Sequence, residues 1–314
     1  MPSDTASISP GTDMTLQIVA ARGHATWWIW TIRDKAGALV EQSTTQFRSA
    51  AAAEAQGRAR IAEFEARRPA RSEQEDAMSL DVWTAPVVAI ALTQIAVVAT
   101  SIYLHRALAH RALVVHPVAD VVFRTVLWLT TGQRRQEWVA VHRKHHAFTD
   151  REGDPHSPRL LGFWKVQLWN VYYYMREVRN AATIQKFAPD LPEDRLDRAV
   201  FSRGWVGLGV GLALLCLALG VWAALGAALA HAVLYVFVMA PLINALGHWR
   251  GAQNFSNTAY NSRVLAWITG GESLHNNHHA HPRAPKFSVR RFEFDPSWVV
   301  IRALAAVKLV VIVR

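Results

Sequence analysis

The sequence predicts an all-α integral-membrane fold, in which transmembrane helices carry a helical cap, with a small α+β unit at the N-terminus. Three observations support this fold class: long stretches without a charged residue, histidines grouped just outside those stretches, and an N-terminal part whose net charge differs from that of the rest. Hydrophobic residues make up 51% of the chain and charged residues only 18%. This charged fraction is low for a soluble protein, which favours a membrane protein.

The first part of the chain is predicted to form a small separate unit of unknown role, within residues 15–69. Aromatic and β-branched residues favour strands, and the residues around Gly37 suit a turn. The expected order is strand, turn, strand, helix and polar linker: 26–33, 34–37, 38–43, 49–67 and 68–76. We therefore predict a ββα unit with its linker at 1–76 and a membrane domain at 77–314.

Two stretches are long enough to cross a bilayer. Residues 85–104 contain no charge, and their length matches the ~20 residues that one helical span needs. Residues 204–247 contain no Asp, Glu, Lys or Arg, and at ~1.5 Å per residue they are too long for a single crossing. We expect a hairpin of two spans there, which turns near residues 220–226.

The remaining apolar segments and the charge distribution predict the topology. Residues 118–132 and 298–313 are apolar but interrupted by charges, and we interpret them as helices that lie at the membrane surface. After residue 83 the chain carries twenty-five Lys or Arg and thirteen Asp or Glu. Three crossings place most of these residues on one side, which the positive-inside rule makes cytoplasmic. The basic excess predicts contact with anionic lipid. Binding to nucleic acid is not expected, because no basic face of a soluble module is evident.

Histidines form four groups just outside the predicted spans. Histidines at positions i, i+3 and i+4 lie on one face of a helix, so each HxxHH is expected to present three imidazoles to a single point. Neutral imidazole is a good ligand for iron, copper, zinc or nickel. Nine candidate ligands exceed what one ion accepts and predict two ions. The candidates are His105, His110, His142, His145, His146, His248, His275, His278 and His279.

These groups resemble the three histidine boxes of membrane fatty acyl desaturases of the stearoyl type, over roughly residues 84–296. The resemblance implies membrane helices below a cytosolic centre of two iron ions, held by the nine histidines. Asn244 and His248 match the family's Asn-x-x-x-His motif. This match implies His248 as the ninth ligand and Asn244 as a partner to one iron through water. A bacterial plasma membrane, with the metal site on its cytoplasmic face, is the expected location.

Three acidic residues beside the boxes are candidates for orienting the histidine rings. A metal-bound histidine needs its other ring nitrogen held by a partner, and carboxylates commonly serve. The candidates are Asp150 and Asp154 after the second box and Glu272 before the third. His156 and His281 lie next to boxes and are interpreted as neighbours of the ligands, while His24, His116 and His231 fit no group.

The resemblance implies O₂-dependent introduction of a cis double bond into a long acyl chain. Animal acyl-CoA enzymes have an Arg-Asp pair where Ala140 and Val141 stand here, so the acyl carrier, coenzyme A or a membrane lipid, stays open. Five tryptophans either line a substrate tunnel or form an interfacial aromatic belt: Trp128, Trp138, Trp164, Trp169 and Trp249.

The reaction needs two electrons per turnover from another protein. The sequence has no Gly-rich nucleotide loop, no fused haem domain and only one cysteine, Cys216, which excludes an iron–sulfur cluster of its own. A separate ferredoxin- or cytochrome-type donor is therefore expected. It is expected to dock on a basic face made by four side chains: Arg134, Arg135, Arg143 and Lys144.

Two alternatives stay open. A hydroxylase or ketolase uses the same metal platform, because the boxes indicate oxygen activation and not its outcome. A membrane metal-binding protein without catalysis would carry its ligands inside the spans, where an ion passes. Only His231 lies deep in a predicted span.

Overall fold

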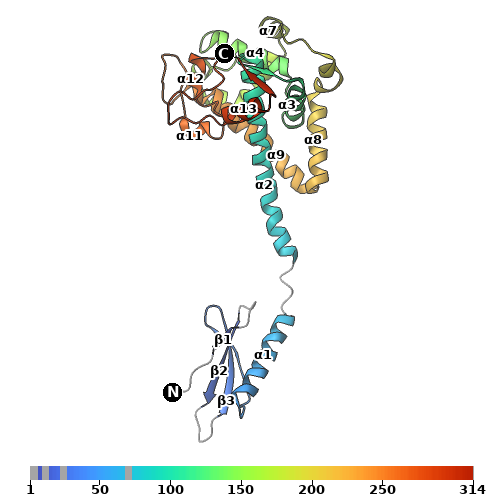
Figure 1. The fold of residues 1–314 in the computed structure, drawn as a ribbon, viewed down its shortest axis with the longest axis vertical. Helices are drawn as coiled ribbons and strands as arrows, with labels where there is room; N and C mark the ends of the chain where they lie inside the picture. Colours follow the sequence, from blue (N-terminus) through green and yellow to red (C-terminus); the bar gives the residue numbers. More distant parts are fainter. Residues whose placement is uncertain (1–5, 9–13, 22–26, 68–72, 314) are drawn as a thin grey trace. The chain divides into compact units, whose positions relative to one another are not determined.

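The computed structural model describes residues 6–8, 14–21, 27–67 and 73–313, and it is mostly helical. The chain divides into two compact units, Met1–Ser79 and Leu80–Arg314. Figure 1 draws both units.

The N-terminal unit is an antiparallel four-stranded sheet, with one helix packed on it. The strands follow the chain order β1-β2-β3-β4 and are β1 (Ala6–Ile8), β2 (Met14–Ala21), β3 (Trp27–Asp34) and β4 (Leu39–Gln42). Helix α1 (Ala50–Arg67) covers one face, where Leu16, Ile18, Trp30 and Ile32 form the core with residues of the helix. The sequence predicted the last two strands and the helix, but β1 and β2 were missed. The prediction of a polar linker was wrong over residues 73–76, because these belong to the next helix. Residues 68–72 lie outside the described residues.

Two helices of the second unit are long and apolar enough to cross a membrane, Trp83–Ala109 and Val221–His248. The first consists of α2 (Glu73–Ala99) and the π-helix η1 (Thr100–Ala109). The second consists of α9 (Val221–Val233), the π-helix η3 (Leu234–Met239), α10 (Ala240–Asn244) and the 3₁₀ turn η4 (Leu246–His248). Figure 1 shows α2, α8 (Gly204–Leu219) and α9 extending from the same end of this unit.

The predicted helical hairpin is present, but only its second arm, Val221–His248, is long and apolar enough to be a candidate span, because the first arm has 16 residues. Helix α8 (Gly204–Leu219) is followed directly by α9, and Gly220 between them has φ +78°, which suits glycine. Helix α3 (Pro117–Thr130) packs on α8 where the latter has glycines. A Cβ on Gly207 would lie 2.2 Å from the carbonyl oxygen of Trp128, so only glycine allows this approach.

The cap is built from short helices at the other end of this unit (Figure 1). They are α4 (Arg135–Phe148), α5 (Pro158–Leu161), α6 (Phe163–Val178), α7 (Ala181–Phe187), the π-turn η2 (Asp197–Phe201), α11 (Arg263–Ala266), α12 (His275–Ala280) and α13 (Pro296–Ala306). The closing segment was predicted as one helix, which is wrong beyond Ala306. Lys308 has φ +60° there, and β6 (Val310–Ile312) pairs antiparallel with β5 (Leu113–Val115).

Candidate metal centre

The first box lies on a π-helix, which brings its two histidines together. The backbone N–H of His110 donates to the carbonyl oxygen of His105 at 3.1 Å, a bond across five residues. In an α-helix these two positions would point roughly 140° apart. A π-turn is wider and places them on one side, and such turns are frequent at functional sites. The two ring centroids are 4.9 Å apart.

All nine predicted histidines converge in two clusters. Within each cluster, one ring nitrogen from each histidine lies within 4.8 Å of those of the others. The first cluster contains His105, His110, His142, His146 and His278, and the second contains His145, His248, His275 and His279.

The two HxxHH boxes are each divided between the clusters, so the prediction that each box presents three imidazoles to one point is wrong. On α4, His142 and His146 belong to the first cluster and His145 to the second. On α12 the division is reversed, and only His278 belongs to the first cluster. Positions i and i+4 differ by about 40° around a helix, whereas i+3 lies about 60° to the other side of i. Each helix therefore faces both clusters.

The second cluster is a closed ring of Nε2 atoms. Neighbouring Nε2 atoms are separated by 3.1 Å between His145 and His248, 3.0 Å between His248 and His275, 3.1 Å between His275 and His279, and 3.4 Å between His279 and His145. Imidazole nitrogens bound to one ion lie ~2.0–2.1 Å from it, so two of them at adjacent coordination positions lie roughly 3 Å apart. The observed separations match that spacing.

Nε2 atoms of the first cluster face one another in the same way. His278 lies 3.0 Å from His105 and 2.9 Å from His146, and His110 lies 2.9 Å from His142, each between Nε2 atoms. The cluster gathers its ligand atoms from η1, α4 and α12.

Each of the three acidic residues singled out in the sequence contacts the other ring nitrogen of a clustered histidine. Glu272 lies 2.5 Å from Nδ1 of His105. Asp154 lies 3.0 Å from Nδ1 of His145, and a carboxylate oxygen of Asp150 lies 3.0 Å from Nδ1 of His248. These contacts fix the orientation of one ring in the first cluster and of two in the second.

The donor set fits a metal ion. A carboxylate only accepts hydrogen bonds, so His145 and His248 donate from Nδ1 and carry a lone pair on Nε2. These two Nε2 atoms face each other at 3.1 Å without a proton to share. Two lone pairs at this distance repel, and a cation between them turns the repulsion into coordination.

The protonation of the buried rings also suits a metal. Burial lowers the pKa of these imidazoles well below its ordinary value, and neighbouring imidazoles lower it further. The rings are therefore neutral near pH 7, which is the form that binds a metal. The residues are His142, His146, His275, His278 and His279.

A tenth histidine lies beside the second cluster. His156 is buried and its ring stacks on His145, with 4.5 Å between the centroids. It forms a third candidate group with His145 and Asp154. Burial, followed by the nearby His145, lowers the pKa of His156 to about 3. The sequence placed His156 next to the ligands, and the structure confirms that position.

The other histidines among the described residues lie apart from the clusters. His231 contacts the hydroxyl of Thr93 on α2 at 3.0 Å and the backbone of α3. His116 caps α3, and His281 is exposed. His24 lies outside the described residues.

Two adjoining cavities open beside the clusters. One of about 90 Å³ is lined by His105, His142 and His275. The other, of about 120 Å³, also contacts His142. Asn244 lines both cavities, and its amide nitrogen donates to the side-chain oxygen of Asn170 at 3.4 Å.

One of the five singled-out tryptophans belongs to this site. Trp138 lines both cavities and stacks on His142 at 4.9 Å between ring centroids. Trp128 packs against α8, and its indole N–H donates to the carbonyl oxygen of Arg203. Three others are exposed: Trp164, Trp169 and Trp249.

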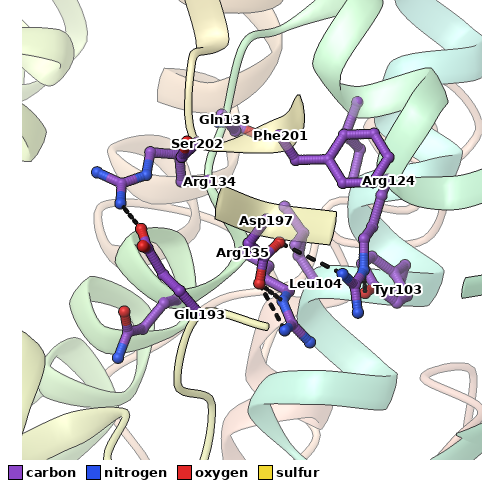
Figure 2. A pocket seen from close by; sticks show the side chains of 12 residues that line it. Tyr103, Leu104, Arg124, Gln133, Arg134, Arg135, Glu193, Asp197, Phe201 and Ser202 are labelled. Atoms are coloured by element: carbon purple, nitrogen blue, oxygen red, sulfur yellow. Dashed lines mark hydrogen bonds and ion pairs between the residues drawn. The ribbon is translucent and has the colours of Figure 1, made fainter. Parts of the chain in front are cut away.

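The four cations expected to form a docking face are paired with acids of this chain. Figure 2 shows Arg134 with Glu193, and Arg135 sharing Asp197 with Arg124. Arg143 pairs with Asp190 at 2.5 Å and Lys144 with Glu177 at 2.6 Å. These four side chains therefore do not form a free basic surface, because acids from more distant segments fold against α4.

The sequence comparisons agree with this geometry. A model of the family described as "Fatty acid desaturase" matches residues 81–294. The chain is 29% identical over 209 residues to an sn-1 stearoyl-lipid 9-desaturase of Synechocystis, an alignment that covers 65% of this chain and 64% of that relative. It is 30% identical over 231 residues to Delta-9 acyl-lipid desaturase 2 of Arabidopsis thaliana, which covers 70% of this chain and 71% of the relative. Because the family model matches more than half of its length, this membrane protein belongs to the fatty acid desaturase family.

Proposed function

We propose that this family member is an oxidoreductase that introduces a cis double bond into a long acyl chain, with two iron ions at the histidine clusters. The observation that carries the proposal is the convergence of nine imidazoles in two clusters, with their Nε2 atoms facing one another. The relatives described above are named for acyl-lipids, which supports a membrane lipid as the acyl carrier.

Each cluster holds one ion in this proposal. The five histidines of the first cluster bind one iron, and the four of the second bind the other. Asn244, which lines the cavity beside them, contacts one iron through water. When bound, the irons supply the oxidising power toward an unactivated methylene that no side chain has. The chain supplies the position and orientation of the ligands.

The carboxylates hold the rings in place. Glu272 accepts from Nδ1 of His105 and from the hydroxyl of Ser101, and it lies 3.9 Å from the guanidinium of Arg106. That guanidinium binds Asp295 at 3.0 Å, so the first cluster is tied to the start of α13. This buried network restricts the movement of His105 during turnover.

The two cavities hold the acyl chain beside the clusters. Their lining contains apolar residues of α2 and η3, which suit a methylene chain and exclude water: Val97 and Met239 in one cavity and Val236 in the other. Trp138 closes the cavity against His142, and its flat ring keeps the imidazole in one orientation.

A separate donor supplies electrons. Formation of a double bond removes two hydrogens, while the reduction of O₂ to two waters takes four electrons and four protons. Two electrons and two protons are therefore still needed in each turnover, and a ferredoxin- or cytochrome-type protein with its reductase provides the electrons. The enzyme lies in a bacterial plasma membrane with the cap on the cytoplasmic side, which the basic excess after residue 83 supports.

Lipid profiling tests this proposal. The chain is expressed with a competent donor in a host that lacks desaturases, and new unsaturated chains are expected. Unchanged unsaturation despite iron-loaded protein would refute the proposal, and an added oxygen would indicate a hydroxylase.

A matched pair of variants tests the ligand assignment. His278→Ala is expected to lose iron and product, because His278 faces His105 and His146. His281→Ala is the control, because that ring is exposed and outside both clusters. Wild-type turnover of His278→Ala would contradict the assignment.

A further inference from the structure

Helix α6 exposes several large apolar side chains. Trp164 is 70% exposed, Leu168 56%, Tyr172 59% and Met175 38%. Trp164 and Leu168 share one face before the kink at Trp169 (φ −114°, ψ 20°), and Tyr172 and Met175 share one face after it. Phe163 at the start of α6 contacts Trp249, which extends this exposed face beyond the helix. An apolar stripe of this kind marks an interaction surface.

The opposite face of α6 points into the protein and carries polar groups. Val166 and Tyr173 are buried on it. The amide nitrogen of Gln167 donates to the carbonyl oxygen of Phe237 at 3.0 Å, and Asn170 accepts from Asn244. A helix on a soluble surface has its polar face outward. The reversed arrangement of α6 suits an apolar surrounding.

Lipid is the occupant that this face fits. The bond from Gln167 fixes α6 alongside the apolar helix Val221–His248, whose Leu229 and Phe237 are 69% and 48% exposed. The exposed apolar residues of α6 therefore lie on a helix that is bonded directly to a candidate membrane span. Trp and Tyr are enriched where a membrane meets water. Lys165 is exposed near the start of α6, where it can reach lipid phosphates.

The same helix forms part of the wall of a cavity at the site. Asn170, Val171 and Tyr174 line the cavity of about 120 Å³ that contacts His142. Val171 is also 41% exposed, so this side chain both lines the cavity and faces the surroundings of the helix. The hydroxyl of Tyr174 is buried and has no hydrogen-bond partner among the described residues, which leaves a donor for the ester group of a lipid.

From these contacts we propose that α6 lies in the membrane interface and forms a lateral portal at Val171. The acyl chain of a membrane-resident lipid enters the cavity through it without leaving the bilayer. The interfacial position of α6 is independent of the reaction, whereas the role of the portal rests on the proposed desaturase function.

Quenching by brominated lipid tests the interfacial position without any need for activity. Cys216 is the only cysteine, so a Cys216→Ser background allows one fluorophore at Leu168→Cys. In bilayers of brominated phosphatidylglycerol, the fluorophore at position 168 should be quenched nearly as strongly as one at Leu217→Cys on α8. Leu217 is 85% exposed. A label at Glu152→Cys, in the exposed turn after α4, should be quenched little. Quenching at position 168 no stronger than at position 152 would overturn the proposal.

A matched pair of substitutions tests the portal. Val171→Trp fills the wall of the cavity, whereas Tyr172→Trp places the same side chain at the next position, which is exposed and does not line the cavity. With stearoyl phosphatidylglycerol in nanodiscs, Val171→Trp should lower turnover about tenfold or more, or ~1.4 kcal/mol, at unchanged iron content. Tyr172→Trp should stay within about twofold of the wild type.

The outcomes separate the two proposals. Full turnover by Val171→Trp, beside an active wild type, refutes the portal alone. A metal-loaded wild type that desaturates no acyl substrate, whether lipid or thioester, refutes the proposed function.

Discussion

The hydrogen bond between Asp154 and His145 offers a sharp test of how the site is built. Both carboxylate oxygens lie close to Nδ1, at 3.0 and 3.1 Å, and they also accept from the backbone N–H groups of Asp150 and His156. Asp154→Asn keeps the size of the side chain but removes its charge and turns one oxygen into a donor. A charge-assisted hydrogen bond contributes ~1.5–3 kcal/mol, so we expect a ~10–100-fold weaker second metal site.

The assay is a metal titration of the apoprotein, with bound iron counted per chain. Wild-type protein should bind two ions, whereas Asp154→Asn should bind one tightly and the second weakly. Asp190→Asn is the matched control, because that acid pairs with Arg143 and Arg111 and not with a clustered histidine. Two ions bound to Asp154→Asn with wild-type affinity would show that the carboxylate does not orient the ligand.

Three further predictions concern stability. Gly207→Leu drives a side chain into α3, which we expect to cost ~1–3 kcal/mol and to lower the melting temperature in detergent. His231→Phe removes its bonds to Thr93 and to the backbone of α3, and it should cost up to ~2 kcal/mol without changing iron content. The guanidinium of Arg143 holds the pKa of Asp190 well below its usual range. The stabilisation from this pair is therefore present above pH ~4 and is lost as pH falls, so the melting temperatures of wild type and Asp190→Asn should converge toward pH 2. A constant difference across that range would contradict the pairing.

Patterns that are local in the chain predicted much of the fold. The charge-free stretches predicted the two long apolar helices and the helical hairpin, because the cost of placing a charge in hydrocarbon is read from composition alone. The four-stranded sheet was only half predicted. Strand β1 has three residues and no strong local signal, whereas β2 alternates Met14, Leu16 and Ile18 with Thr15 and Gln17, a local strand pattern that was missed. Both are ordered by pairing with neighbouring strands, and β2 pairs directly with β3.

The acids that contact the histidine rings show the same limit of patterns that are local in the chain. Glu272 follows His105 by many residues in the chain, yet the two are in contact; the sequence named Glu272 as a candidate to orient a ring but not which ring. The expected basic face failed for a related reason. Arg143 and Lys144 are basic in the sequence, but Asp190 and Glu177 lie against them in the fold. A charge count along the chain does not show which charges are neutralised.

The residue order by itself predicted which imidazoles gather at the site, and it favoured two ions because nine ligands exceed the capacity of one. Only the tertiary structure decided how they are shared. His145 and His146 are adjacent in the chain, yet they belong to different clusters, because α4 lies between the two groups and consecutive side chains on a helix point about 100° apart. The packing of η1, α4 and α12 around one another, which no local pattern encodes, completes each cluster.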